Sequence, residues 1–248
     1  MGVWSISQER RDELMDDPAL PDGDHMHALA ALRTINAISL TAKRLAEAVE
    51  RILPRGLDRP LVIADLACGG GDVTVALADR LAARRDGCGN GPVAVRVIGV
   101  DISGRAVDRA RSLAARRGCT AAEFAVGDIV ADGCPPCDIA VSSLFLHHLD
   151  DAAAGRVLSS MAATASCGGA VSDLLRTRAG LALAVLGTTL LSTSRVARID
   201  GPVSVKAART MAEYRLLLDD SGLAHAGVRR TWPERCVIEW TSTGHGVI

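Results

Sequence analysis

The chain has few aromatic side chains and almost no charge imbalance. Only 2% of its 248 residues are aromatic, so it lacks the stacking platforms that single-strand nucleic-acid binders use. Its 28 basic and 29 acidic side chains leave a net charge of -1, which supplies no surplus for contacts to phosphate backbones. These two shortages argue against a nucleic-acid partner and favour a small-molecule substrate.

Long apolar runs and targeting signals are also missing. The most apolar stretch, residues 179–191, is interrupted by glycine and threonine and is too short to cross a bilayer, so no integral membrane association is expected. The first ten residues have no basic region followed by an apolar run, and the seven cysteines do not resemble the disulfide framework of a secreted domain. We therefore expect a protein of the reducing cytoplasm.

What the sequence does contain is an alternation of strand-like and helix-like segments. Residues 61–66 form a continuous apolar run, which is typical of a parallel strand covered on both faces. The strands predicted after it are 93–100, 121–126, 138–142 and 169–175, and the helices are 72–84, 103–118 and 151–164. Two further strand-like runs, 228–231 and 236–240, are joined by too few residues for a crossover helix and predict an antiparallel hairpin. The fold class is therefore α/β, with a doubly wound, mostly parallel sheet of about seven strands and a C-terminal hairpin.

The N-terminal region has a different pattern. Residues 1–24 are polar and predict a flexible lead, and apolar residues at helical spacing predict one or two helices over 25–53. Pro54, Gly56 and Pro60 then interrupt the chain. We predict an N-terminal lead and helical cap over 1–53, a main domain over 54–248, and a candidate substrate-cover insertion at 176–209. A helix follows at Thr210, which begins a capping-box pattern.

The clearest chemical signal is the loop after the first strand, Asp65-Leu66-Ala67-Cys68-Gly69-Gly70-Gly71-Asp72. Consecutive glycines let the backbone turn sharply and approach a ligand closely, and the next helix presents its amides to that ligand. The loop fails the dinucleotide fingerprint because Thr74 occupies the third glycine position. The Asp65 carboxylate would repel a pyrophosphate but attract the ammonium group of an amino-acid-bearing cofactor. The charge therefore favours S-adenosylmethionine (SAM) over NAD.

This loop resembles the first motif of the class I SAM-dependent methyltransferases, in which an acidic residue is followed by alternating glycines. Ala67 and Gly70 depart from that pattern. The resemblance implies a Rossmann-like fold, and it covers residues 61–175 well and the flanks only loosely. It implies that the cofactor-binding residues of the loop are Asp65, Ala67, Cys68, Gly69 and Gly71.

The resemblance continues at the ends of the next two strands. It implies that Asp101, followed by Ile102, accepts hydrogen bonds from the ribose hydroxyls of the cofactor. It also implies that Asp128 accepts the adenine amino group, while the backbone amide of Ile129 meets the adenine ring. A single acid at a strand end is often an ordinary helix cap, but three acids in this order after three successive strands are typical of the family.

The segment after the fourth strand supplies the first catalytic candidates. Ser142, Ser143 and His147 are expected to border the cofactor or the substrate, because ligands lie beyond the carboxyl ends of parallel strands. His147 is the first candidate for a general base and His148 the second. Alternatively, this pair packs against the following helix and caps it together with residues 150–151. Methyl transfer to an activated oxygen can also proceed by proximity and alignment, without a base.

Other polar residues are weaker candidates. Asp173 ends the fifth strand and is the third catalytic candidate. Asp200 is a substrate-binding candidate, and Arg176 is a candidate to bind an acidic substrate group. Arg33 and Asn36 interrupt an apolar helical pattern and are expected to face the bound molecules.

No metal site is predicted from the sequence. The run Cys134-Pro135-Pro136-Cys137 has the spacing of a zinc-ligand pair, but a tetrahedral site needs two more ligands and no second pair of this kind exists.

The sequence therefore predicts a SAM-dependent methyltransferase. The apolar segment 180–187 implies an apolar acceptor, although it could equally complete the core. The expected reaction is methyl transfer to an oxygen, with carbon as the second choice, of a small and rather apolar metabolite such as a phenolic, polyketide-like or quinone-precursor compound. An NAD-dependent oxidoreductase and a noncatalytic SAM-binding protein stay open as alternatives, and the oligomeric state, a homodimer included, is undetermined.

Overall fold

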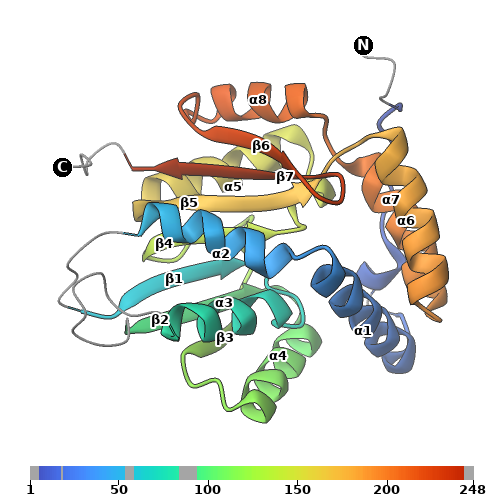
Figure 1. The fold of residues 1–248 in the computed structure, drawn as a ribbon, viewed down its shortest axis with the longest axis horizontal. Helices are drawn as coiled ribbons and strands as arrows, with labels where there is room; N and C mark the ends of the chain where they lie inside the picture. The colour runs from blue at the N-terminus through green and yellow to red at the C-terminus, as the bar shows by residue number, and fades with distance from the viewer. Residues whose placement is uncertain (1–5, 18, 54–58, 84–93, 243–248) are drawn as a thin grey trace.

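The computed structural model describes residues 6–17, 19–53, 59–83 and 94–242, which form a seven-stranded sheet flanked by helices (Figure 1). The strands are β1 (Leu61–Leu66), β2 (Val95–Asp101), β3 (Ala122–Val126), β4 (Cys137–Ser143), β5 (Ala165–Leu174), β6 (Gly227–Thr231) and β7 (Arg235–Thr241). The helices are α1 (Asp22–Ile38), α2 (Thr41–Ile52), α3 (Asp72–Ala82), α4 (Gly104–Arg117), α5 (Asp151–Thr164), α6 (Arg178–Leu191), α7 (Arg195–Ala207) and α8 (Met211–Asp220). Two short 3-10 turns are η1 (Leu14–Asp16) and η2 (Leu146–His148).

The strand order is β3-β2-β1-β4-β5-β7-β6. Strands β1 to β5 pair in parallel, and β7 pairs antiparallel with both β5 and β6. The order reverses between β1 and β4, which is the point where open parallel sheets bind ligands. The prediction of a Rossmann-like, mostly parallel sheet with a C-terminal antiparallel hairpin is confirmed.

Helices cover both faces of the sheet. On one face, α2 and α3 pack against the central strands through a fully buried cluster that includes Leu45, Leu77 and Ile139. On the other face, α5 and α8 pack through a cluster that includes Leu158 and Tyr214. Because both faces are covered, five of the six residues of β1 are buried.

A third group of helices lies beyond the carboxyl edge of the sheet. Figure 1 shows the arrowheads of β1 and β5 pointing toward α1, α6 and α7. Helix α6 packs along α7, and α1 contacts both. The structure thus forms a cover over the edge where the parallel strands end, from residues 22–38 and 178–207. The predicted division at residues 53 and 54 stays a prediction, and α2 packs on the sheet rather than in this cover.

Most predicted element limits agree with the structure to within a few residues. Helix α5 matches its prediction at both ends, and the capping box at Thr210 is present in both of its hydrogen bonds. Strand β5 begins at Ala165, four residues before the expected start, because it follows α5 directly with no turn residue between them. The predicted ends at residues 84 and 93, and the interruptions at residues 54 and 56, lie outside the described residues.

The N-terminal lead was expected to be flexible, and its described part is instead held on α7. The side-chain amide of Gln8 donates to the Ala207 carbonyl at 2.9 Å. The backbone amides of Leu14 and Met15 donate to the Asp200 carboxylate at 2.9 and 3.0 Å. Among the described residues, none of the helices has the length and apolar character needed to span a membrane.

Candidate cofactor and acceptor site

A cavity of about 830 Å³ lies between the carboxyl edge of the sheet and the cover helices. Its volume is within the roughly 300–1,000 Å³ range of small-molecule sites. The predicted site residues that line it are Ala67, Cys68, Gly69, Asp101, Ile102, Asp128, Ile129, Ser143, His147, His148, Asn36 and Asp200. Residues that were predicted from six separate parts of the sequence therefore meet in one cavity.

The glycine loop and Asp101 form one end of this cavity. Gly69 has a φ of +52°, and a Cβ atom built on it would meet no atom within 4 Å, so the backbone there is open to a ligand. The Gly69 amide donates to Asp101 Oδ2 at 2.8 Å, and the Ser103 amide donates to Oδ1 at 2.9 Å. The loop and the carboxylate thus hold each other in place at the cavity wall. Ala67 also has a positive φ, of 57°, and such strained residues cluster at functional sites.

Asp128 and Ile102 lie beside this loop at the cavity wall. Asp128 Oδ1 accepts the backbone amides of Val130 and Ala131 at 3.0 and 3.2 Å, which fixes the carboxylate and leaves Oδ2 for a ligand. The Ile102 side chain is 69% exposed and gives the cavity an apolar surface at this end. Two fixed carboxylates, an open glycine loop and an apolar surface between them fit the ribose, the adenine and the amino-acid end of SAM.

Three predicted cofactor residues do not reach the cavity. Asp65 is fully buried and turns toward α3, where its Oδ2 accepts the Thr74 hydroxyl at 2.6 Å. Gly71 begins α3, and its Cβ would lie 2.6 Å from the Cβ of Ala110, so it is a glycine because of helix packing. Ser142 is also buried, and its hydroxyl donates to the Leu66 carbonyl at 2.9 Å, linking β4 to β1. In the structure each of these three has a role inside the protein, and its contact with the cofactor stays a prediction.

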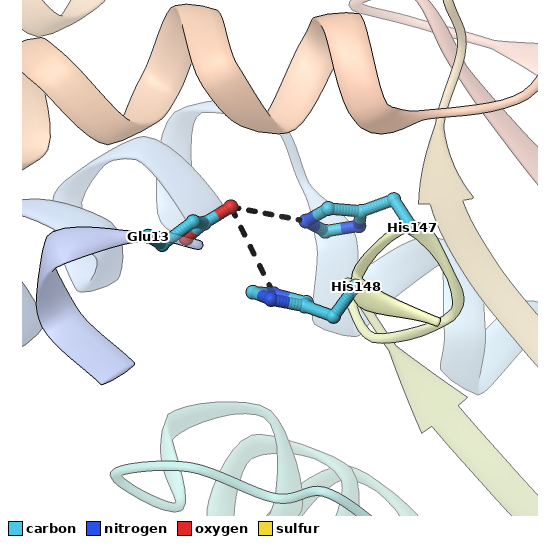
Figure 2. A group of neighbouring side chains, drawn as sticks. All are labelled: Glu13, His147 and His148. Carbon is cyan, nitrogen blue, oxygen red and sulfur yellow. Dashed lines mark ion pairs between the residues drawn. The ribbon is translucent and has the colours of Figure 1, made fainter. Parts of the chain in front are cut away.

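At the other end of the cavity, a carboxylate meets two imidazoles (Figure 2). Glu13 Oε1 lies 3.7 Å from His147 Nε2 and 3.9 Å from His148 Nε2. The opposite ring nitrogen of His147, Nδ1, lies 2.6 Å from Asp173 Oδ1, and its backbone amide donates to Asp173 Oδ2 at 3.0 Å. Asp173 does not itself line the cavity, but it holds the imidazole that does.

The environment shifts the pKa values of this group in opposite directions. Burial alone would lower the pKa of His147, but the carboxylates of Asp173 and Glu13 outweigh it and raise that pKa to about 9. Burial alone would raise the pKa of Asp173 and of Glu13, but the neighbouring imidazoles lower both. His147 is therefore held between two ionised carboxylates. This arrangement favours a proton-bearing or ligand-bound ring over a free base, and the general-base role stays a prediction.

The substrate-binding predictions divide between the cavity and the protein interior or surface. Asn36 lines the cavity and accepts hydrogen bonds from Arg235 at 3.3 and 3.4 Å. Asp200 also lines it, with both carboxylate oxygens accepting backbone amides of the lead. Arg176 lies elsewhere: it is 5% exposed and pairs with the Glu213 carboxylate and the Ala208 carbonyl. Arg176 is therefore a structural residue that ties β5 to α7 and α8.

Arg33 was also expected to face the bound molecules, and that contact stays a prediction. Its side chain is exposed and lies outside the cavity lining, because the helical face that carries it points to solvent. The apolar face of α1, with Leu29 and Leu32, lines the cavity instead.

Glu13 and Arg235 are among the charged residues of the site that the sequence analysis did not identify. Glu13 lies in a polar lead with no motif around it, so no local signal identified it. Arg235 begins β7, where it is 4% exposed and lines the cavity, and burial lowers its pKa to about 10. The sequence signal that could have identified Arg235 is its position, as an arginine directly before a largely apolar strand-like run.

Cys134 and Cys137, which were not expected to bind a metal, lie close together. The two Sγ atoms lie 3.8 Å apart, away from the cavity, and no third metal-ligating side chain joins them among the residues that the structure describes.

Comparison with known proteins supports the same family as the motifs. Residues 63–169 match the family model of a methyltransferase domain. No curated protein matches the chain at a significant level.

Several solved structures share the fold. The magnesium protoporphyrin IX methyltransferase of Synechocystis with bound SAH is 18% identical, with a TM-score of 0.56 over 92% of this chain and 91% of that one. Human N-acetylserotonin methyltransferase in complex with SAM is 17% identical, with a TM-score of 0.59 over 90% of this chain and 57% of that one. An O-methyltransferase family 2 protein of Planctomyces limnophilus in complex with apigenin is 18% identical, with a TM-score of 0.58 over 91% and 63%. The chain thus spans less than two thirds of the length of the last two. The matched segment is thus that of a methyltransferase domain, and the fold is one that SAM- and SAH-bound methyltransferases share.

Proposed function

We propose that this protein transfers the methyl group of SAM to an oxygen of a small, rather apolar metabolite. One observation carries the proposal: a single cavity joins the Gly69, Asp101 and Asp128 end of the sheet to a polar cluster at Glu13 and His147. A volume of about 830 Å³ is large enough for a cofactor and an acceptor side by side.

The lining of the cavity indicates the class of acceptor. The walls contributed by α1 and α6 are mainly apolar and include Leu29, Leu32 and Leu183. Glu13 and the two histidines form one compact polar cluster in the cavity, where an acceptor that buries an apolar body against these walls would place a polar group. This distribution suits a phenolic, polyketide-like or quinone-precursor compound better than a sugar or an acidic metabolite.

The residues of the chain contribute alignment and a dry environment. When bound, SAM supplies an electrophilic methyl group on its sulfonium. Asp101, Asp128 and the open backbone at Gly69 would hold the cofactor at the carboxyl edge of the sheet, and the cover helices would exclude water. Binding the acceptor oxygen in line with the methyl carbon converts a bimolecular step into an effectively unimolecular one. This alignment supplies a large part of the rate enhancement of a methyl transfer.

Calorimetric titration with SAM tests the cofactor end of the site. Wild-type protein is expected to bind SAM, and Asp101→Asn is expected to bind it at least about 10-fold more weakly, since a hydrogen bond to a charged group contributes roughly 1.5–3 kcal/mol. Asp132→Asn is the matched control, because Asp132 is exposed on a neighbouring loop and outside the cavity. Thermal unfolding of each variant shows that the fold is retained. Equal SAM affinity of Asp101→Asn and wild type would contradict the assigned site.

The acceptor is tested separately. Purified protein is incubated with SAM carrying an isotopically labelled methyl group and an extract of the source cells, and labelled products are identified by mass spectrometry. A labelled methyl ether on an apolar compound supports the proposal. SAM binding without any labelled product would favour the noncatalytic alternative, and a labelled carbon or nitrogen centre would correct the acceptor atom.

A further inference from the structure

The cluster of Glu13, His147 and His148 has the composition of a metal site. One carboxylate oxygen and one nitrogen of each imidazole all lie within 4.8 Å of one another (Figure 2). The three side chains come from two segments far apart in the sequence, the lead before η1 and the turn η2. All three line the cavity, so an ion bound between them could also reach a ligand there.

The surroundings orient these side chains as they do in built metal sites. Asp173 Oδ1 lies 2.6 Å from His147 Nδ1, which turns the Nε2 of that ring toward Glu13. A carboxylate on the far nitrogen of a ligating histidine is the usual partner in protein metal sites, because it fixes the tautomer and the ring orientation. The Glu13 carboxylate in turn accepts the Ser204 hydroxyl.

The backbone that follows Glu13 is also anchored. Asp200 accepts the amides of the two residues that follow Glu13, at 2.9 and 3.0 Å. Glu13 is only 7% exposed, although it belongs to a lead that the sequence shows as polar. The lead is thus held so that the buried Glu13 faces the histidines.

We propose that Glu13, His147 and His148 bind a divalent transition-metal ion, with zinc as the best fit, and leave one coordination position open to the cavity. Two imidazoles and one carboxylate are an established protein set for zinc with an open fourth position, whereas magnesium and calcium prefer oxygen ligands. A doubly charged ion would also balance the two buried carboxylates of Glu13 and Asp173. The separations of 3.7 and 3.9 Å exceed those around a tetrahedral zinc by about half an ångström. Small rotations of Glu13 and of His148, the more exposed of the two histidines, would close these differences.

The open position gives the ion a role in the proposed reaction, and this step rests on the proposed function. An acceptor hydroxyl would release its proton to solvent as its oxygen binds there, because a bound metal lowers the pKa of a hydroxyl group. The resulting oxyanion would form a bond to the methyl carbon while the bond from that carbon to the sulfonium breaks, and S-adenosylhomocysteine would be the leaving group. The acceptor class narrows accordingly to compounds with a phenolic or enolic hydroxyl.

Zinc titration of chelator-treated protein tests the site. Isothermal calorimetry is expected to show one Zn²⁺ per chain for the wild type, and Co²⁺ is expected to give the visible absorption bands of a low-coordinate site. His148→Ala should weaken zinc binding by at least about 100-fold, more than the loss of a hydrogen-bonded partner of a ligand costs. Glu13→Gln should act in the same direction while keeping the shape of the side chain.

Two controls separate this site from other metal ligands. His225→Ala removes an exposed histidine outside the cavity, and Cys134→Ser removes one thiol of the pair whose sulfur atoms lie 3.8 Å apart. Both variants should bind zinc as the wild type does. The proposal is wrong if the wild type binds no zinc, if His148→Ala binds it equally well, or if only Cys134→Ser loses it.

SAM titration in the same samples keeps the two proposals apart. Zinc binding at this site without SAM binding would refute the proposed function and leave the metal site standing. SAM binding and methyl transfer by protein that binds no zinc would refute the metal site and leave the proposed function standing.

Discussion

The Asp65 carboxyl group should make the stability of this protein depend on pH. It is fully buried at the end of β1, where Oδ2 accepts the Thr74 hydroxyl and Oδ1 has no hydrogen-bond partner among the described residues. Burial raises the pKa of Asp65 from 3.8 to about 7, and the nearby charge of Asp101 adds to the effect. The folded protein therefore holds this proton more tightly than the unfolded chain does.

The sign of the pH dependence follows from that difference. A carboxyl whose pKa is higher in the folded state contributes stability that is complete below the unfolded pKa of 3.8 and is lost as the pH rises through about 7. At roughly 1.36 kcal/mol per pKa unit, the whole loss is about 4 kcal/mol. About 2 kcal/mol of it falls between roughly pH 5.5 and pH 8.

Asp65→Asn tests this reasoning, because asparagine keeps the shape of the side chain and stays neutral. Urea titration measures the free energy of unfolding of the variant and of the wild type. The difference between the two should shift in favour of the variant by about 2 kcal/mol when the pH is raised from roughly 5.5 to 8. For a chain of this size, that corresponds to about 4–8 °C in melting temperature. Asp132→Asn, at an exposed position, should show no such difference. An equal effect of Asp65→Asn at both pH values would refute the assignment of a neutral buried carboxyl.

The remaining predictions concern the cofactor end of the cavity. Ile102→Ala should weaken SAM binding by about 10-fold, because the ligand would cover a side chain that is 69% exposed, while calorimetric unfolding should change by less than about 0.5 kcal/mol. Gly71→Ala should lower the free energy of unfolding by about 1–3 kcal/mol, since its Cβ would lie 2.6 Å from that of Ala110. Gly69→Ala should be less destabilising, because its Cβ would meet no atom within 4 Å, and should instead reduce SAM affinity. A Gly71→Ala protein as stable as the wild type, or a Gly69→Ala protein with unchanged SAM affinity, would contradict the roles assigned to the two glycines.

The fold was predictable because its signals are local. A continuous apolar run marks β1, a capping box marks the start of α8, and the short connection between β6 and β7 permits only an antiparallel pair. The approximate places of Asp101 and Asp128 followed in turn, because the carboxyl ends of parallel strands lie at one edge of the sheet.

The direction of each side chain was not predictable in the same way. Asp65, Gly71 and Ser142 occupy motif positions at that edge, but each packs inward, against α3, α4 or β1. Which way a residue at the end of a strand points depends on the pleat of that strand and on the helix packed against it. The sequence motif indicates only that the residue lies near the carboxyl end of its strand.

The sequence by itself determined the order of strands and helices, the class of the fold and the two carboxylates at the cofactor end, because each depends on residues close together in the chain. Only the tertiary structure decided the acceptor end. Glu13 meets Ser204 across 191 positions of sequence, and His147 meets Asp173 across 26. In neither pair does the sequence around one residue indicate its partner. Packing of the lead on α7 brings the charged groups together in the interior, where low solvent exposure makes their interactions strong.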